Sequence, residues 1–265
     1  MHKIAVFNRK GGVGKTTTSI NLASSLAAKD KRILILDVDP QINATTYLLD
    51  NEKYEPSITL TEYLSGKTNK VEAHKVLFSK ETSKGTKILE SNIYVLPSSQ
   101  EMEYVDINNP FIIREILENY ENEFDYCFID CPPSLSDLTT CALVAANYVL
   151  VPLLAEKDCV NGYSMVLDAI DGIRDNGFNN SLQIIGIFIN AFDRRRAKAK
   201  TYLEVWKDSD NKDFMKSYIR NTADIANASD FGKPINYYKR SCASSKEYSL
   251  LADELIMRIQ RLEKE

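Results

Sequence analysis

The sequence holds very few histidines, because only His2 and His74 occur in its 265 residues. A catalytic triad built on histidine, or a metal centre rich in histidine ligands, is therefore close to excluded. The five cysteines form no C-x-x-C pair. An odd number of cysteines without such spacing is typical of reduced, buried thiols and not of a disulfide framework.

Long apolar runs and a strong net charge are also absent. No apolar run is long enough to span a bilayer, and the N-terminal MHKIAVFN has the pattern of a strand and not of a signal peptide, so we expect a cytoplasmic protein. The net charge of −4 does not indicate a nucleic-acid binder as a whole. Residues 194–240 nevertheless carry twelve Lys and Arg against six Asp and Glu, which permits a local basic surface.

Short β-rich apolar runs alternate with amphipathic helical patterns along most of the chain. The runs are apolar on both faces, which is typical of buried parallel strands, and the alternation predicts an α/β fold with a doubly wound, mostly parallel sheet flanked by helices in three layers. Strands are predicted at 3–8, 32–39, 92–98, 125–132, 148–154 and 183–190. Helices are predicted at 15–29, 110–123, 138–146, 160–174, 198–207 and 246–264.

No feature of the sequence marks a domain boundary, since it has no internal repeat, low-complexity tract or linker. We therefore expect residues 1–265 to form a single domain. Residues 50–90 are polar and rich in lysine, and we expect helical or loop decoration there. The last helix, 246–264, has its apolar residues near one face and is expected to close the core.

The clearest signal is FNRKGGVGKTT, in which a predicted strand leads through glycines into a predicted helix. Such a loop turns backbone N–H groups inward around an anion, and the N-terminus of the helix adds its dipole. In the phosphate-loop pattern Lys15 reaches the β- and γ-phosphates, the Thr16 hydroxyl ligates Mg²⁺, and Thr17 can bond the α-phosphate. The loop residues expected around the phosphates are Gly11, Gly12, Val13 and Gly14.

Two further runs place acidic residues at the ends of buried strands. YCFIDCPP puts Asp130 at the end of a strand, which is the Walker B geometry for holding Mg²⁺. In ILILDVDP, Asp37 and Asp39 stand two residues apart and so point to the same side of the strand. One of them can orient or deprotonate an attacking water. Helix capping and loop solvation stay open as another interpretation of this pair.

The segments KGGVGKTT, DVDPQINAT and FDYCFIDCPPS together resemble the deviant-Walker-A ATPases of the ParA/MinD class, and most of all the ParA-type partition proteins. Those proteins commonly read N-x-K-G-G-V-G-K-T-T, then D-x-D-P-Q, then D-x-P-P-S. The tail FGKPINYYKRSCASSKEYSLLADEL is similar to the ending of the same family, so the likeness spans nearly the whole chain. The resemblance implies a P-loop NTPase fold with ATP and Mg²⁺ as cofactors.

The resemblance also implies roles for individual residues. In this family ATP-bound monomers form a face-to-face homodimer, and a signature lysine at the position of Lys10 reaches the nucleotide of the other subunit. Asp39 would position the hydrolytic water, with Asp37 and Asp130 at the Mg²⁺ ion. Asn190 would lie near the adenine, although a turn residue at a strand end is an equal alternative. The implied catalytic residues are Lys10, Lys15 and Asp39, with slow basal hydrolysis that a partner accelerates.

Relatives of this kind differ in what the ATP-bound dimer binds. The segment FDRRRAKAK leads from a predicted strand into a helix, and basic residues there would give salt-dependent affinity for DNA without reading its sequence. An ordinary solvated helix face is the alternative interpretation. The residues expected to contact non-specific double-stranded DNA are Arg194, Arg195, Arg196, Lys198, Lys200, Arg220, Lys239 and Arg240.

The family likeness therefore implies a bacterial, nucleoid-associated partition ATPase whose release from DNA is triggered by a ParB-like centromere-binding protein. The main alternative is an ATPase that positions another cargo or a MinD-like membrane switch. No membrane contact is expected, because the end of the chain, LIMRIQRLEKE, is charge-balanced and lacks bulky aromatics. An iron–sulfur reductase would need glycine-flanked cysteines, and an ATP-dependent ligase would want a larger substrate domain.

Overall fold

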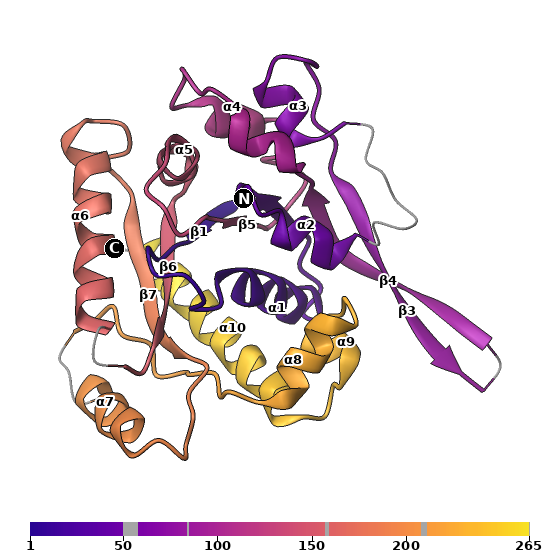
Figure 1. Ribbon diagram of the computed structural model, residues 1–265, viewed down its shortest axis with the longest axis vertical. Helices are drawn as coiled ribbons and strands as arrows, with labels where there is room; N and C mark the ends of the chain where they lie inside the picture. The colour runs from indigo at the N-terminus through magenta and orange to yellow at the C-terminus, as the bar shows by residue number, and fades with distance from the viewer. Residues whose placement is uncertain (50–57, 84, 157–158, 208–210, 265) are drawn as a thin grey trace.

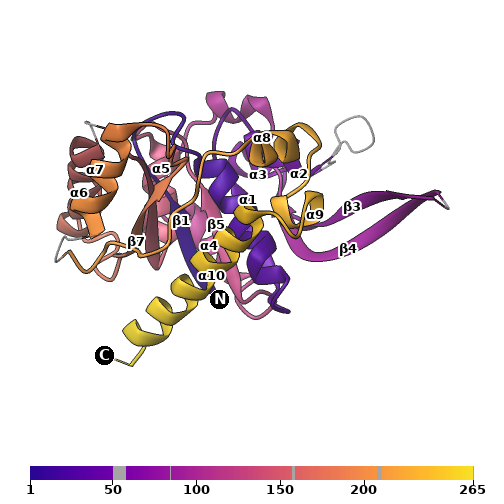
Figure 2. The same ribbon diagram turned by 90° about the horizontal axis from the view of Figure 1, so that it is seen from below.

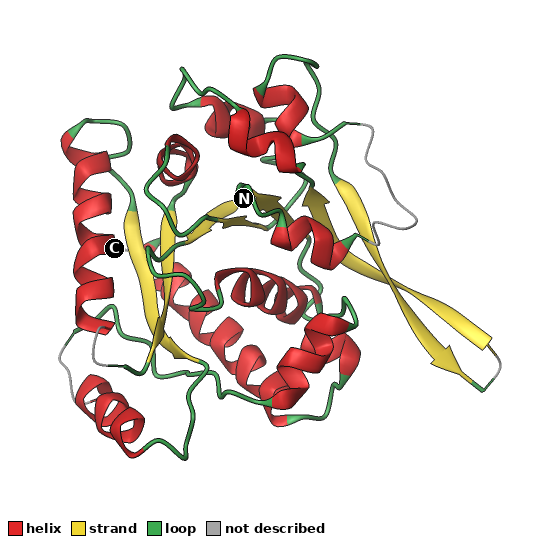
Figure 3. Ribbon diagram, viewed as in Figure 1, coloured by secondary structure: helices red, strands yellow, loops and turns green. Residues whose placement is uncertain are grey.

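A computed structural model describes residues 1–49, 58–83, 85–156, 159–207 and 211–264. Within these residues the centre is a seven-stranded sheet with the strand order β3-β4-β2-β5-β1-β6-β7 (Figures 1 and 3). Only the β3–β4 pairing is antiparallel. The strands are β1 (His2–Val6), β2 (Ile33–Asp37), β3 (His74–Thr82), β4 (Gly85–Leu96), β5 (Tyr126–Asp130), β6 (Tyr148–Leu154) and β7 (Gln183–Asn190).

Helices cover both faces of the sheet, so the predicted three-layer, doubly wound fold is confirmed. One face packs against α3 (Leu60–Leu64), α4 (Ile112–Glu118), α5 (Asp137–Ala145) and α6 (Cys159–Asp175), with η1 (Gln100–Tyr104) beside them. The other face packs against α1 (Lys15–Ala27), α2 (Asn43–Leu48), α8 (Ala223–Asp230), α9 (Ile235–Tyr238) and α10 (Ala243–Leu262). The helix α7 (Ala197–Lys207) follows β7.

The central strands form where the sequence is apolar on both faces. Every residue of β2 and β5 is buried, because helices cover the sheet on both sides. The predicted closing helix is confirmed as α10, whose buried residues include Tyr248, Leu251, Leu255 and Ile259. Among the helices of the described residues, none has the length and apolar character needed to cross a bilayer. The single-domain expectation stays a prediction.

Residues 50–90 are where the sequence prediction was wrong. Besides α3 and loop residues, the described part of this region contains β3 and the first half of β4, which form an antiparallel hairpin. Only Ile93–Leu96 of β4 pairs with β2, so the rest of the hairpin projects to one side as an arm (Figure 2). Its polarity misled the prediction because only one face of a projecting two-stranded ribbon is buried, so few apolar residues are needed.

The arm is held to the body through that one face. The ring of Phe78 lies 4.3 Å from the ring of Tyr237 in α9, measured between centroids, and only 3% of Phe78 is exposed. The opposite face carries Leu77 and Ile88, which are 55% and 58% exposed. Successive side chains of a strand point to opposite faces, so Phe78 is packed while its neighbour Leu77 is solvated.

This packing predicts unequal effects of two neighbouring substitutions. Phe78→Ala should lower the free energy of unfolding by about 3 kcal/mol, because it removes a buried ring and leaves a cavity. Leu77→Ala, its matched control on the solvated face, should change it by less than about 0.5 kcal/mol. Urea unfolding followed by circular dichroism measures both values. Equal losses for the two variants would contradict the packing of the arm through Phe78.

Candidate functional site

The loop between β1 and α1 encircles the N-terminus of α1, as the phosphate-loop pattern predicts. Gly12 and Gly14 have φ angles of 72° and 84°, which residues with a side chain disfavour. Gly14 is also closely packed, since a Cβ atom there would lie 2.3 Å from the amide nitrogen of Asn190. No side chain caps α1, so an anion can accept hydrogen bonds from its first-turn N–H groups.

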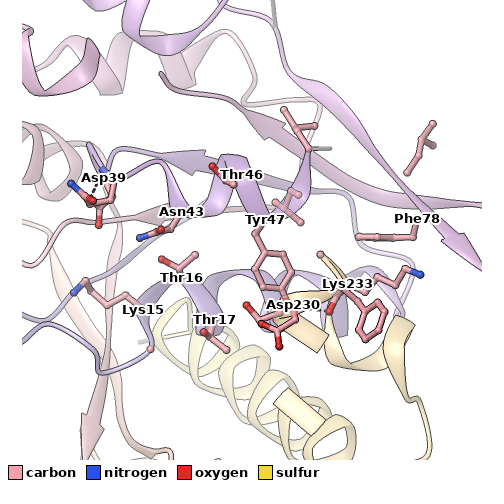
Figure 4. A pocket seen from close by; sticks show the side chains of 18 of the residues that line it. Lys15, Thr16, Thr17, Asp39, Asn43, Thr46, Tyr47, Phe78, Asp230 and Lys233 are labelled. Carbon is pink, nitrogen blue, oxygen red and sulfur yellow. Dashed lines mark hydrogen bonds between the residues drawn. The ribbon is translucent and has the colours of Figure 1, made fainter. Parts of the chain in front are cut away.

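Lys15 is the first residue of α1, and its side chain turns back over the loop (Figure 4). The Nζ atom lies 3.4 Å from the backbone oxygen of Lys10, and only 7% of the residue is exposed. Burial lowers the pKa of Lys15, while the nearby carboxylate of Asp130 opposes that change. Burial costs this ammonium its hydration. A phosphate group beside it would favour the charged form and so offset that loss.

Asp37 and Asp130 lie side by side at the carboxyl ends of two neighbouring strands. They are opposite each other in the parallel register of β2 and β5, and neither is exposed. Burial raises the pKa of both carboxyl groups, and the proximity of Asp37 raises the pKa of Asp130 further. Two buried carboxylates on neighbouring strands favour the binding of a divalent cation, because its charge offsets both their loss of hydration and their mutual repulsion.

Hydroxyl groups hold both carboxylates in place. The Oδ2 atom of Asp130 accepts a hydrogen bond of 2.6 Å from Thr16 Oγ1, and its Oδ1 atom accepts one of 2.9 Å from Ser19 Oγ. The Oδ2 atom of Asp37 accepts from both the backbone N–H and the hydroxyl of Thr45, each at 2.8 Å. Of the predicted metal residues, Thr16 therefore contacts Asp130, and Asp37 lies opposite Asp130 in the strand register.

These oxygen atoms fit Mg²⁺, which prefers hard oxygen ligands and keeps several waters. The Thr16 hydroxyl and the Asp130 carboxylate are already in contact, so an ion beside them would meet both. The described residues contain no group of three or more His, Cys, Asp or Glu that could hold a metal ion by itself.

Asp39 lies at the mouth of the site in the loop that follows β2 (Figure 4). Its Oδ1 atom accepts a hydrogen bond of 2.9 Å from the N–H of Gln41. The loop then passes through Ile42, whose φ angle of 47° is unusual for a β-branched residue. Strained backbone of this kind costs about 1–3 kcal/mol and is common in loops that act at functional sites.

A recess of about 1340 Å³ opens in front of the phosphate loop. It is larger than the usual site for a small ligand. Its inner wall is the loop with Lys15, Thr16 and Thr17, and its outer wall includes Tyr47, Phe231 and the base of the arm. A nucleoside triphosphate can therefore enter with its phosphates against α1 while part of the recess stays open.

Asn190 lies beneath the phosphate loop and not among the described residues that line the recess. Its Nδ2 atom donates a hydrogen bond of 2.7 Å to the backbone oxygen of Val13, and only 5% of the residue is exposed. In this position the side chain supports the loop conformation. A contact between Asn190 and an adenine stays a prediction.

The basic residues predicted to contact DNA fall into two groups. Those at the start of α7 are exposed: Arg194, Arg195, Arg196, Lys198 and Lys200. Arg220 is adjacent to this segment, because it forms a β-bridge with Phe192, but its guanidinium pairs with Glu247. Lys239, which pairs with Asp224 at 3.0 Å, and Arg240 lie beside α9, away from α7 (Figure 1).

Sequence reasoning missed several residues that position the site. Ser19 and Thr45 hold the carboxylates, and Ser98 donates a hydrogen bond to the backbone oxygen of Asp37. Glu156, from the segment after β6, forms an ion pair of 2.8 Å with Lys10. Serine and threonine are common residues, so their presence does not indicate a role. A single glutamate far from the phosphate loop in the sequence belongs to no motif. The sequence alone therefore did not reveal these contacts.

The cysteines whose side chains the structure describes do not line the recess. Cys127, Cys131, Cys141 and Cys242 are buried free thiols, as the sequence predicted, while the side chain of Cys159 lies outside the described ones. Burial raises the pKa of Cys131, which follows Asp130, well above the usual range of a thiol. A thiol of this kind is protonated and unreactive at neutral pH.

Comparison with known proteins places this site in a family. A family described as "AAA domain" matches residues 1–184. The chromosome partitioning protein ParA of Caulobacter vibrioides is 32% identical over 263 residues, which cover 96% of this chain and 94% of that protein. The sporulation initiation inhibitor protein Soj of Bacillus subtilis is 32% identical over 95% of this chain and 97% of its own.

Solved structures share the fold. Septum site-determining protein MinD of Pyrococcus horikoshii, complexed with Mg-ADP, has a TM-score of 0.74 at 22% identity, covering 96% of this chain and 95% of its own. Cobyrinic acid a,c-diamide synthase of Mycobacterium smegmatis, with ADP and magnesium, has a TM-score of 0.74 at 24% identity. That match covers 98% of this chain and 96% of the other.

The sequence relatives identify the family, because they are similar to this chain over nearly its whole length. Curated ParA and Soj proteins from several bacteria share 31–32% identity with it over 95% or more of its length. The chain belongs to the ParA family of P-loop ATPases.

Proposed function

We propose that this protein is a DNA-partition ATPase that binds ATP with Mg²⁺, forms a homodimer across the nucleotide, and holds DNA non-specifically in that state. A ParB-like partner then stimulates hydrolysis and release. The observation that carries the proposal is the presence of two lysines, Lys10 and Lys15, on one phosphate loop that also faces Asp37 and Asp130. The ParA and Soj relatives support the partition role.

Within one subunit, Lys15 and the first-turn N–H groups of α1 would bind the phosphates. Thr16 and Asp130 would hold the Mg²⁺ ion, and Asp37 would support its water shell. The ion supplies charge compensation for the phosphate oxygens. No strong nucleophile is needed, because phosphoryl transfer to water depends on positioning and electrostatic stabilisation.

The ammonium of Lys10 pairs with Glu156, while the backbone oxygen of Lys10 accepts a hydrogen bond from Lys15. An ammonium reaching a second subunit's ATP would stabilise the negative charge that develops on the γ-phosphate oxygens. It would also make the dimer depend on that phosphate, since the contact exists only when ATP is present.

The dimer role of Lys10 can be tested by substitution. Lys10→Ala should bind ATP with near wild-type affinity but weaken the dimer formed with Mg²⁺ and AMPPNP by about 10- to 100-fold, the effect of losing a charged hydrogen bond. Light scattering measures the dimer and calorimetry measures the nucleotide. Lys15→Ala is the control and should lose nucleotide binding itself. A Lys10→Ala dimer of normal strength would rule out this role.

Asp39 is proposed to orient the attacking water from the mouth of the site. Asp39→Asn keeps an oxygen to accept the Gln41 N–H but removes the basic carboxylate. Turnover should therefore fall about 100-fold or more, while ATP binding and the dimer persist. Phosphate release assays measure the rate. Unchanged turnover would mean that another group, or water alone, fills this role.

DNA retention should depend on the exposed basic segment at α7. Replacing Arg194, Lys198 and Lys200 by Gln removes three charges and leaves Arg195 and Arg196, which contact acidic neighbours. The affinity for DNA with ATP should fall, and the slope of log affinity against log salt concentration should become shallower by up to about 5, because the dimer loses three charges from each subunit. DNA co-sedimentation with ATP, ADP or no nucleotide measures this.

A matched control removes the same charge from another exposed surface. Lys246, Arg261 and Lys264 lie on the exposed side of α10 or at its end, and their replacement by Gln should leave the salt dependence nearly unchanged. If both triple variants lose DNA equally, bulk charge governs binding and the α7 segment has no special part. Liposomes in place of DNA test the membrane alternative, which has less support because the apolar face of α10 is buried in the core.

A further inference from the structure

One carboxylate is shared between the second lysine and the basic segment. The Oε2 atom of Glu156 lies 2.8 Å from Nζ of Lys10, and its Oε1 atom lies 3.7 Å from the guanidinium of Arg196. Glu156 follows β6, Lys10 follows β1, and Arg196 precedes α7. Three residues from separate parts of the chain therefore meet beside the phosphate loop.

Buried contacts hold the partners of this cluster in register. The N–H of Lys10 donates a hydrogen bond of 2.9 Å to Oδ1 of Asn8, and Nδ2 of Asn8 donates one of 2.8 Å to the backbone oxygen of Pro152 in β6. Asn8 is only 1% exposed. The base of the loop is thus fastened to the strand that leads to Glu156, so the Lys10–Glu156 pair does not rest on a chance meeting of two long side chains.

Arg196 has a second acidic neighbour on its other side. Asp193 lies 4.0 Å from the guanidinium of Arg196 and 3.0 Å from that of Arg195. Arg196 itself is 68% exposed, so its side chain has room to move. It can therefore approach Glu156 more closely without leaving a buried charge unpaired.

We propose that Glu156 is a positioning residue. In the lone subunit its carboxylate holds the ammonium of Lys10 in a standby position. When the ammonium moves away, the carboxylate pairs with the guanidinium of Arg196 instead. This inference rests on the proposed action of Lys10 on the ATP of a second subunit. For that action the ammonium must separate from Glu156. Arg196 is the other cation that pairs with Glu156 among the residues that the structure describes, so it can compensate the carboxylate after the separation.

The strength of the pair suits a contact that must open. The side chains of Lys10 and Glu156 are 38% and 41% exposed, and ion pairs of such exposure change an equilibrium by up to about fivefold. A charged hydrogen bond to phosphate is worth more than that. ATP in a second subunit therefore outcompetes Glu156, whereas the lone subunit keeps Lys10 in place.

The test compares two substitutions with opposite expected effects. Glu156→Gln removes the standby contact and should tighten the dimer formed with Mg²⁺ and AMPPNP by two- to fivefold. Arg196→Gln removes the cation that would pair with Glu156 after Lys10 separates from it. The separation is then less favourable, so the dimer should weaken by a similar factor. Neither should alter nucleotide affinity, because neither residue lines the recess. Sedimentation equilibrium without DNA measures the dimer.

A second glutamate supplies the matched control. Glu121 is 42% exposed and lies 2.8 Å from Nζ of Lys3 and 3.2 Å from the N-terminal ammonium, so Glu121→Gln makes the same chemical change away from the phosphate loop and should leave the dimer unchanged. In the double variant with Lys10→Ala, Glu156→Gln should have no further effect, because it acts only through Lys10.

The outcomes separate the two proposals. A wild-type protein that stays monomeric with AMPPNP overturns the proposed homodimer, and a dimer that does not need Lys10 overturns the proposed role of Lys10. Either result overturns the standby role as well. A Lys10-dependent wild-type dimer that Glu156→Gln leaves equal or weaker overturns the standby role alone. Tightening by Glu156→Gln that persists in the Lys10→Ala background would also overturn it, since the effect would then bypass Lys10.

Discussion

The site depends on the pairing of β2 with β5, which sets Asp37 against Asp130 without access to water. Two carboxylates in this position repel each other and lose hydration, so the fold must supply compensation. Thr16, Ser19 and Thr45 give hydrogen bonds, and the ammonium of Lys15 gives charge. The compensation is incomplete, as the raised pKa of each carboxyl shows. A divalent cation with phosphate beside it would complete it.

The phosphate loop is tied to the sheet on both sides, and these ties connect it with the rest of the molecule. Asn190 at the end of β7 supports Val13, while Asn8 joins the loop to β6. The segments that continue from β6 and β7 carry Glu156 and the basic residues before α7. A change at the loop therefore has a short, packed route to the surface proposed to bind DNA.

The fold was predictable where burial leaves a repeating pattern. Strands covered on both faces are continuous apolar runs, and the phosphate loop joins its strand to its helix through glycines, so both were recognised. The arm was not, because a ribbon packed through a residue such as Phe78 and solvated at Leu77 resembles a polar loop. Ser19 and Thr45 were missed for a different reason: their hydroxyl groups matter only through the carboxylates that other elements bring to them.

The sequence by itself determined the chemistry of the loop and the acids, because glycine conformation, helix-terminal N–H groups and strand-end carboxylates act over a few neighbouring residues. The tertiary structure decided which of these groups meet. Lys10 and Glu156 are 146 positions apart, and Asp37 faces Asp130 only through the strand register. Sheet order and register arise from packing across the whole core, which no local pattern of residues records.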